Sequence, residues 1–142
     1  IVIAPTHRTA LLLRYGPCYG YTASSINIIG EHYKREVYRV SNAAEMVESI
    51  IKKAPTADLW PGQTDEAELG FTYELIDNIL YDIEQQHLCR NELYEKYDKE
   101  SVDKIIKRVV SNSFKRYTPF ICQSGIYKRS VIDENIFLNL DK

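Results

Sequence analysis

The chain has 142 residues, of which 44% are hydrophobic and 27% are charged, with 18 Lys and Arg against 20 Asp and Glu. This length and composition fit one globular domain with a sizeable core, and the net charge of −2 argues against a generally basic nucleic-acid-binding protein. No apolar run approaches the roughly 18 residues that a membrane-spanning helix needs, so we expect no such helix.

The cysteines and the first residues indicate the cellular setting. Cys18, Cys89 and Cys122 are an odd number, lie far apart and form no CxxC pair. This pattern suggests neither a zinc site nor a disulfide framework, and it favours a reduced, cytoplasmic setting. The chain opens on Ile1 without a charged and then apolar leader, so we expect a piece or a processed product of a longer protein.

The first thirty residues contain one predicted strand and one predicted helix. The apolar residues 1–4, stopped by Pro5, predict a buried strand, and residues 6–15 predict a helix that ends at a Gly-Pro pair. Residues 15–30 lack periodicity and are interpreted as irregular. A single strand leaves its backbone groups unpaired, so we expect its neighbours to come from outside this chain.

The rest of the chain is predicted to be mostly helical. Apolar residues at helical spacing predict helices over 31–40, 42–51, 72–86 and 98–114. The second of these begins with a capping-box pattern at residues 42–45. A polar stretch, 85–92, precedes the last helix, and the alternation after Thr118 is typical of a strand or an extended arm.

Residues 54–70 carry prolines and glycines without periodicity and are predicted to be a long loop. Its carboxylates and hydroxyls suit a lid over a charged ligand, with magnesium as a possible companion; they are Thr56, Asp58, Thr64, Asp65, Glu66 and Glu68. The alternative interpretation is a solvated acidic loop with Trp60 packed against the core.

Three cations are candidates for phosphate binding. Lys115 and Arg116 follow the last helix, where they could bind phosphate or stabilise a helix C-terminus. Lys34 follows the glycine-containing segment and could bind phosphate or simply be solvated. The histidines have no metal-ligand partner at helical spacing, and the sequence has neither GxxxxGK[ST] nor GxGxxG. No catalytic residue is assigned from the sequence.

Several segments, taken together, match one family. The most specific are Ala-Pro-Thr-Ala-Asp-Leu-Trp at 54–60, Pro-Gly-Gln-Thr-Asp-Glu at 61–66, and Glu-Leu-Gly at 68–70 followed by Tyr-Glu-Leu-Ile-Asp at 73–77. Further matches lie at 28–34, 15–20 and 112–116. In this order and spacing they resemble NAD synthetase, an enzyme with an α/β, adenine nucleotide α-hydrolase-like (Rossmann-like) fold.

The resemblance implies that residues 1–142 are the C-terminal, mostly helical part of such a domain. NAD synthetases use ATP and Mg²⁺ to adenylylate deamido-NAD, and ammonia, free or derived from glutamine, then displaces AMP. By motif, Lys34 and Thr56 resemble ATP-binding positions, and Lys115 resembles a deamido-NAD contact. The segment 54–70, with Asp58, Asp65 and Glu66, resembles a substrate-covering loop. A homodimer is also implied, with no nucleic-acid or membrane partner.

The sequence also departs from the family pattern. The S-G-G-x-D-S phosphate loop is absent, and Ala10 stands where the family has a magnesium-binding Glu. Pro5 replaces an ATP-contacting Thr, while Cys18 and Ser25 replace a Lys and an Asp that contact deamido-NAD. Two hypotheses follow: an NAD synthetase whose remaining half lies elsewhere, or a non-catalytic relative that binds nucleotide or a partner. A small helical interaction module is a third. We expect this chain alone to be inactive.

Overall fold

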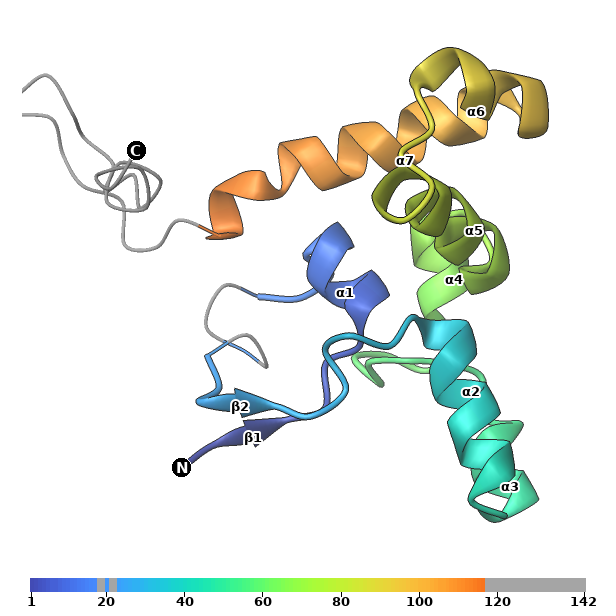
Figure 1. Cartoon of the computed structure of the whole chain (residues 1–142). Helices are drawn as coiled ribbons and strands as arrows, with labels where there is room; N and C mark the ends of the chain where they lie inside the picture. Colours follow the sequence, from blue (N-terminus) through green and yellow to red (C-terminus); the bar gives the residue numbers. More distant parts are fainter. Residues whose placement is uncertain (18–19, 21–22, 117–142) are drawn as a thin grey trace, which may run out of the picture.

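The computed structural model describes residues 1–17, 20 and 23–116 (Figure 1). Its elements, in chain order, are β1 (Ile3–Ala4), α1 (Arg8–Leu13), β2 (Ile26–Asn27), α2 (Lys34–Ala43), α3 (Glu48–Ile51), α4 (Asp65–Leu69), α5 (Tyr73–Glu84), α6 (Arg90–Lys96), α7 (Lys99–Ser111) and the 3-10 helix η1 (Ser113–Arg116). The described part is therefore mostly helical, as the sequence predicts, and it contains one small parallel sheet. Cys18, Cys122 and the segment after Thr118 lie outside the described residues.

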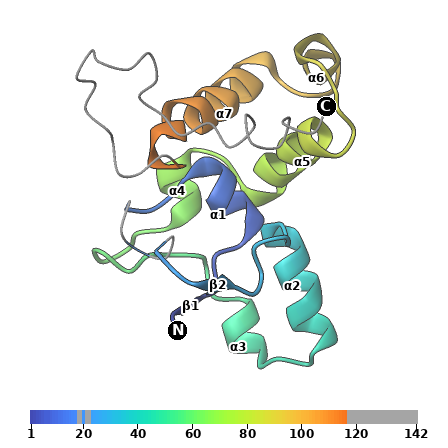
Figure 2. The ribbon, with the colours of Figure 1, turned by 60° about the vertical axis from the view of Figure 1, so that its left-hand side comes forward.

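The sheet corrects the prediction of a single unpaired strand. β1 and β2 pair in parallel, with Ile3 opposite Ile26 and Ala4 opposite Asn27. β2 lies inside the segment 15–30 that was predicted to be irregular, because a two-residue strand is too short to show alternation. The sheet lies on the other side of α1 from α7 (Figures 1 and 2). Ile3 and Ile26 remain 59% and 47% exposed, so one side of this sheet is not covered by the described chain.

The core is built around α5, which packs against α1 and α2, while α7 packs against α1 and α6 (Figure 2). The buried apolar residues form one cluster: Leu13, Tyr33, Leu69, Tyr73, Ile76, Ile79, Leu80, Leu93, Val102 and Ile105. The helical stripes predicted for 72–86 and 98–114 are confirmed as core. Val110 is the exception, because it lies near the C-terminal end of α7 and is 64% exposed.

The prediction that 54–70 is loop throughout is wrong, because α4 lies at its end. The Thr64 side chain caps this helix by accepting a hydrogen bond from the Ala67 N–H at 3.3 Å. Gly70 ends it in the left-handed conformation, with φ at +80°, which glycine adopts without steric cost. A helix of five residues is too short to show a 3.6-residue period, so only its two ends are visible in the sequence.

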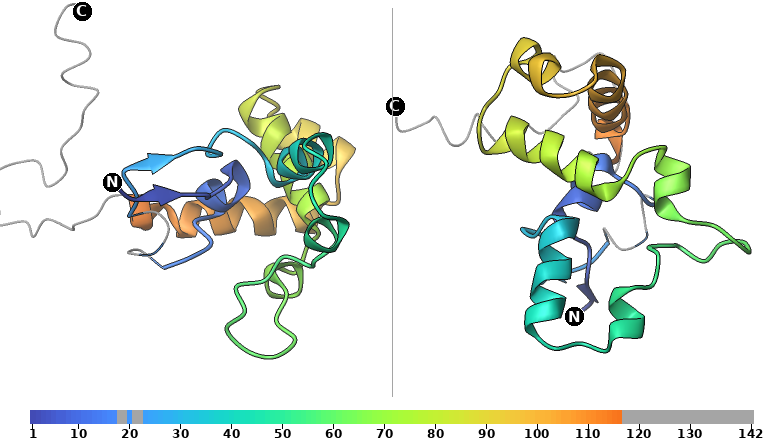
Figure 3. Two further views of the ribbon diagram at one scale, coloured as in Figure 1. Left: turned by 90° about the horizontal axis from the view of Figure 1, so that it is seen from below. Right: turned by 90° about the vertical axis from the view of Figure 1, so that its right-hand side faces the viewer.

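The helix boundaries between residues 31 and 51 also differ from the prediction. Asn42 does not start a helix but lies inside α2, where its Nδ2 donates to the carbonyl of Tyr38 at 2.8 Å. α3 begins only at Glu48 and is four residues long. The apolar stripe expected for this helix is largely exposed: Met46 is 45%, Val47 64% and Ile50 59% accessible. α2 and α3 extend away from α6 and α7 (Figure 3).

Two further differences concern short helices. α6 occupies the end of the polar stretch 85–92 and continues to Lys96, burying Leu93 against α7. α1 is shorter than the helix predicted over residues 6–15, and His7 is its N-cap. Within the part of the chain that the structure describes, no helix is long and apolar enough to cross a bilayer.

Candidate functional site

The N-terminus of α2 is fixed by two fully buried side chains from other helices. The hydroxyl of Thr9 in α1 donates to Asp77 Oδ1 in α5 at 2.5 Å, and it accepts the Lys34 N–H at 3.0 Å. The second oxygen of Asp77 accepts the Arg35 N–H at 2.8 Å. Two of the N–H groups that a helix leaves unpaired at its start are thereby satisfied. Burial raises the pKa of Asp77, and its hydrogen bonds from Thr9 and Arg35 oppose that rise.

The side chain of Lys34, a predicted ATP-binding residue, lies among aromatic rings. Its Nζ is 5.1 Å from the centroid of the Tyr38 ring and 5.6 Å from that of the Tyr73 ring. Both separations are within the range of a cation–π interaction. Burial lowers the pKa of Lys34, while the charges of Asp65 and Asp77 raise it. The structure therefore places a half-buried ammonium group close to two carboxylates at the start of α2.

His7 also contacts Tyr73. The two rings meet edge to face with centroids 5.6 Å apart, and His7 Nδ1 accepts the Ala10 N–H at 3.3 Å. Burial and the charge of Lys34 lower the pKa of His7 to about 4. Its imidazole is therefore neutral at neutral pH and serves as the N-cap of α1.

The carboxylates of α4 are held by hydroxyl and backbone donors. Tyr73 donates its hydroxyl to Asp65 Oδ2 at 2.9 Å, and its N–H to Glu66 Oε1 at 2.7 Å. Tyr15 donates its hydroxyl to Glu68 Oε2 at 2.8 Å, with Asp65 Oδ1 as a more distant acceptor at 3.4 Å. Asp65 and Glu66, two predicted substrate-loop residues, therefore join α4 to the start of α5.

Thr56 and Asp58, the other predicted site residues of the segment 54–70, precede α4 and have other partners. The hydroxyl of Thr56 accepts the Asp58 N–H at 3.0 Å, and the neighbouring carbonyl of Pro55 accepts the Asp65 N–H at 2.9 Å. Thr56 is thereby linked to α4. Asp58 is exposed and lies 3.6 Å from the ammonium group of Lys53. Trp60 is 53% exposed, so it is not packed against the core as the alternative interpretation predicted.

Lys115, the predicted deamido-NAD contact, lies at the other end of α1 from Lys34. Its Nζ donates to the carbonyls of Arg14 and Gly16 at 3.1 and 3.0 Å, just beyond the last turn of that helix. The six residues of α1 span about 9 Å, so this helix separates the two predicted binding residues. Lys115 does stabilise a helix C-terminus, but that of α1 rather than that of the preceding α7.

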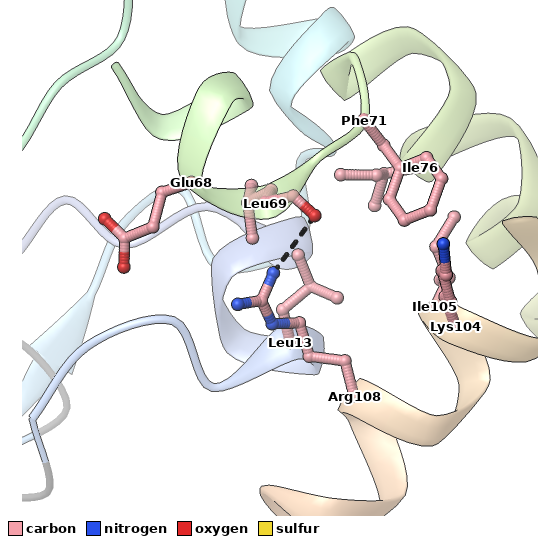
Figure 4. A pocket seen from close by; sticks show the side chains of 8 residues that line it. All are labelled: Leu13, Glu68, Leu69, Phe71, Ile76, Lys104, Ile105 and Arg108. Carbon is pink, nitrogen blue, oxygen red and sulfur yellow. Dashed lines mark hydrogen bonds between the residues drawn. The ribbon is translucent and has the colours of Figure 1, made fainter. Parts of the chain in front are cut away.

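A hollow of about 270 Å³ lies between α1, α4, α5 and α7 (Figure 4). Its lining is mostly apolar, with three charged side chains: Leu13, Glu68, Leu69, Phe71, Ile76, Lys104, Ile105 and Arg108. Arg108 crosses it to donate to the carbonyl of Leu69 at 3.3 Å. Of the candidate residues named from the sequence, Glu68 lines this hollow, whereas Lys34, Thr56 and Lys115 do not.

The described residues do not fit a magnesium site. No group of three His, Cys, Asp or Glu side chains among them is arranged to hold a metal ion. Asp65, Glu66 and Glu68 accept hydrogen bonds from Tyr15, Tyr73 and Gln63. Ala10 brings no carboxylate to α1. Cys18 lies outside the described residues, and Ser25 precedes β2.

Sequence reasoning did not single out Thr9, Asp77, Tyr15 or Tyr73. A signal for Asp77 was available, because it lies four residues after Tyr73 and three before Leu80, on the buried face of its helix. A carboxylate on such a face needs buried donors. Thr9 and Tyr15 carry no comparable signal, since the partners of their hydroxyl groups lie at least 25 residues away. Tyr73 carries none because its partners lie on a helix that the sequence did not reveal.

Sequence comparison finds related proteins of about twice this length. The chain is 41% identical over 124 residues to an NH(3)-dependent NAD(+) synthetase of Wolinella succinogenes, covering 87% of this chain and 48% of that protein. It is 40% identical to the enzyme of the same name from Chlorobium phaeobacteroides, covering 45% of it. The chain therefore spans about half the length of the curated relatives that it matches.

Solved structures agree with these relatives. An NMN synthetase from Francisella tularensis superposes with a TM-score of 0.69 at 26% identity, over 85% of this chain and 46% of that one. An NH3-dependent NAD synthetase from Campylobacter jejuni gives 0.63 at 29% identity, over 85% and 44%. These neighbours have the adenine nucleotide α-hydrolase fold, so the expected fold is confirmed. The sequence model described as NAD synthase matches residues 1–119, and the chain belongs to the NAD synthase family.

Proposed function

We propose that this chain is the C-terminal part of an NAD synthetase that amidates deamido-NAD with ATP and ammonia. The observation that supports this most directly is the connection between Lys34 and Thr56. Lys34 donates its N–H to Thr9, it lies near Asp65, and Asp65 is hydrogen bonded to the residue before Thr56. The two predicted ATP-binding residues are thereby joined through the segment that the family resemblance assigns to substrate covering.

In the proposed reaction, a carboxylate oxygen of deamido-NAD attacks the α-phosphorus of ATP and pyrophosphate leaves. Ammonia then attacks the carbonyl carbon of the adenylate, loses a proton, and AMP leaves with the bonding electrons. The Lys34 ammonium group would bind phosphate oxygens and balance the charge that develops on them. The Thr56 hydroxyl would donate to the nucleotide, and Lys115 would bind deamido-NAD. Because the described residues do not fit Mg²⁺, we assign it no ligand in this chain.

The proposal divides the site between this chain and another segment. The family's S-G-G-x-D-S phosphate loop does not occur in the sequence, and Ala10 replaces a metal-binding Glu. We therefore propose that the 142 residues alone do not form NAD, and that residues 54–70 cover a site completed by a phosphate-loop half. A cytoplasmic homodimer without nucleic-acid partners belongs to the same proposal. The nitrogen donor is ammonia, free or released from glutamine.

A non-catalytic relative is the second candidate. Ala10 favours it, because an alanine can neither coordinate a metal nor balance its charge. In that case the residues around Lys34 would bind nucleotide, or the exposed apolar residues would bind a partner, without amide formation. The two candidates differ in whether NAD forms once the phosphate-loop half is supplied.

Isothermal titration with Mg-ATP, and then with deamido-NAD, tests the proposal. We expect Mg-ATP to bind, and we expect Lys34→Ala and Thr56→Ala to weaken that binding. Lys107→Ala, at an exposed position of α7, should leave it unchanged. NAD formation is then assayed with the chain alone and with a separately produced phosphate-loop half of a relative. NAD formed by the chain alone would contradict the proposed division of the site. No NAD with both halves, despite Mg-ATP binding, would favour the non-catalytic relative.

A further inference from the structure

Asp65 occupies the point where three parts of the chain meet. As the first residue of α4, it accepts the hydroxyl of Tyr73 from α5 and faces the hydroxyl of Tyr15, which follows α1. Its own N–H donates to the carbonyl of Pro55 at 2.9 Å. Asp65 is half-buried, so these contacts hold its carboxylate in one orientation rather than leaving it in solvent.

Tyr73 contacts both Asp65 and Lys34. Its hydroxyl binds the carboxylate of Asp65, and its ring lies 5.6 Å from the ammonium nitrogen of Lys34. Among the described residues, no carboxylate oxygen lies within 4.0 Å of that nitrogen. The ammonium group is therefore near a negative charge but is not neutralised by a direct ion pair.

The charge of Asp65 acts against the desolvation of Lys34. Burial lowers the pKa of this lysine, and Asp65 is the first of two carboxylates that raise it again. The other is Asp77, whose oxygens are taken up by Thr9 and by the Arg35 N–H. His7, Tyr38 and Tyr73 also lie around Lys34, and the imidazole of His7 is neutral at neutral pH. Asp65 is the carboxylate of this set that belongs to the segment 54–70.

We propose that Asp65 is a positioning residue, which holds the Tyr73 hydroxyl and thereby directs the Lys34 ammonium group over the Tyr73 ring so that it can bind a polyphosphate. This inference rests on the proposed ATP binding by Lys34. The hydrogen bond from the Asp65 N–H to the carbonyl of Pro55 joins the same residue to the neighbour of Thr56, so the placement of the segment 54–70 and the position of the Lys34 ammonium group depend on each other.

The first test measures Lys34 directly and does not require ATP. Competitive acetylation across a pH series, read by mass spectrometry of the Lys34 peptide, gives the pH midpoint of its reactivity. We expect Asp65→Asn, which keeps the shape and an acceptor for Tyr73, to lower this midpoint. Tyr73→Phe, which keeps the ring but releases Asp65, should lower it by a smaller amount. Glu74→Gln, at an exposed position of α5, is the matched control and should leave it unchanged.

The second test is a double-mutant cycle on Mg-ATP affinity. Asp65→Asn should weaken binding about 3- to 10-fold in the wild-type background and have no effect in the Lys34→Ala background. Equal weakening in both backgrounds would show that Asp65 acts independently of Lys34 and would overturn the inference. An unchanged Lys34 midpoint in Asp65→Asn and Tyr73→Phe would also overturn it. If Mg-ATP binds neither to the wild-type chain alone nor to the chain with the phosphate-loop half, the proposed function fails, and the acetylation midpoints still decide whether Asp65 controls Lys34.

Discussion

The hydroxyl of Thr9 in α1 and the carboxylate of Asp77 in α5, 68 residues apart in the sequence, form a fully buried hydrogen bond 2.5 Å long. The same two side chains accept the first N–H groups of α2, at Lys34 and Arg35. Three helices therefore meet at one buried polar pair. Because Lys34 is the first residue of α2, this pair also determines where its side chain begins.

Asp77→Ala is expected to lower the free energy of unfolding by about 1–3 kcal/mol, because the Thr9 hydroxyl and the Arg35 N–H lose their buried acceptor. Urea unfolding followed by far-UV circular dichroism measures this change. Glu74→Gln, at an exposed position on the same helix, should change it by less than about 0.5 kcal/mol. A loss no larger than that of the control would mean that water reaches these donors in the variant.

The long helices could be predicted from the sequence because their burial repeats along the chain. Ile76, Ile79 and Leu80 follow the 3.6-residue period, and all three are buried in the core. The elements that were missed are short. β2 has two residues and α4 has five, so neither is long enough for its pattern to recur along the chain. Their formation depends on contacts with β1 and with Tyr15 and Tyr73, which no local pattern reveals.

The candidate site, like the fold, could be predicted from the sequence only in part. Lys34 and Thr56 could be named from motifs, because motifs are local in sequence. Their connection through Tyr73 and Asp65 could not, since it depends on how α2, α4 and α5 pack. The stripe predicted from Met46 to Ile51 shows the opposite error: the period is present, but the described chain provides no element to cover it.

Arg8 donates to both carboxylate oxygens of Glu84, so we expect its replacement by lysine to destabilise the fold. Its Nε and Nη2 donate to the two oxygens of Glu84 at 3.0 and 2.5 Å, and Tyr33 donates its hydroxyl to the same carboxylate at 2.7 Å. Arg8→Lys keeps the charge but loses the fork, so we expect a loss of about 1 kcal/mol in unfolding free energy. The measurement is urea unfolding at neutral pH.

The exposed pair of Lys52 and Glu48 is the control for this prediction. Both side chains are more than 70% accessible, so Lys52→Ala should cost less than about 0.5 kcal/mol. If Arg8→Lys costs no more than Lys52→Ala, the fork contributes nothing beyond a surface charge. The prediction would then be wrong even though the distances favour it.

Because of His7, we expect the free energy of unfolding to fall as pH is lowered below neutral. Burial and the charge of Lys34 lower its pKa to about 4, whereas an unfolded chain has a histidine pKa near 6.5. The unfolded state therefore binds more protons between these values, so the stabilisation is complete above about pH 6.5 and is lost as pH falls toward 4. Between about pH 7.5 and pH 5 we expect a loss of about 2 kcal/mol from this residue.

The variant His7→Asn isolates this contribution. Asparagine can still cap α1 but does not titrate, so the difference between wild type and variant should shrink by about 2 kcal/mol as pH is lowered. His32→Asn, at an exposed position, is the control for a histidine replacement outside this cluster. A pH dependence identical in wild type and His7→Asn would show that His7 takes up its proton in the folded state without penalty.

Lys115→Met separates a structural role of this lysine from a binding role. The change removes the ammonium group that donates to the Arg14 and Gly16 carbonyls but keeps much of the aliphatic stem, so we expect a loss of about 1 kcal/mol in unfolding free energy. Lys107→Met, at an exposed position of α7, should be neutral. Titration with deamido-NAD under conditions where the variant is fully folded then measures binding by itself. Weakened binding supports the proposed contact, whereas unchanged binding with reduced stability would mean that Lys115 serves only to close the end of α1.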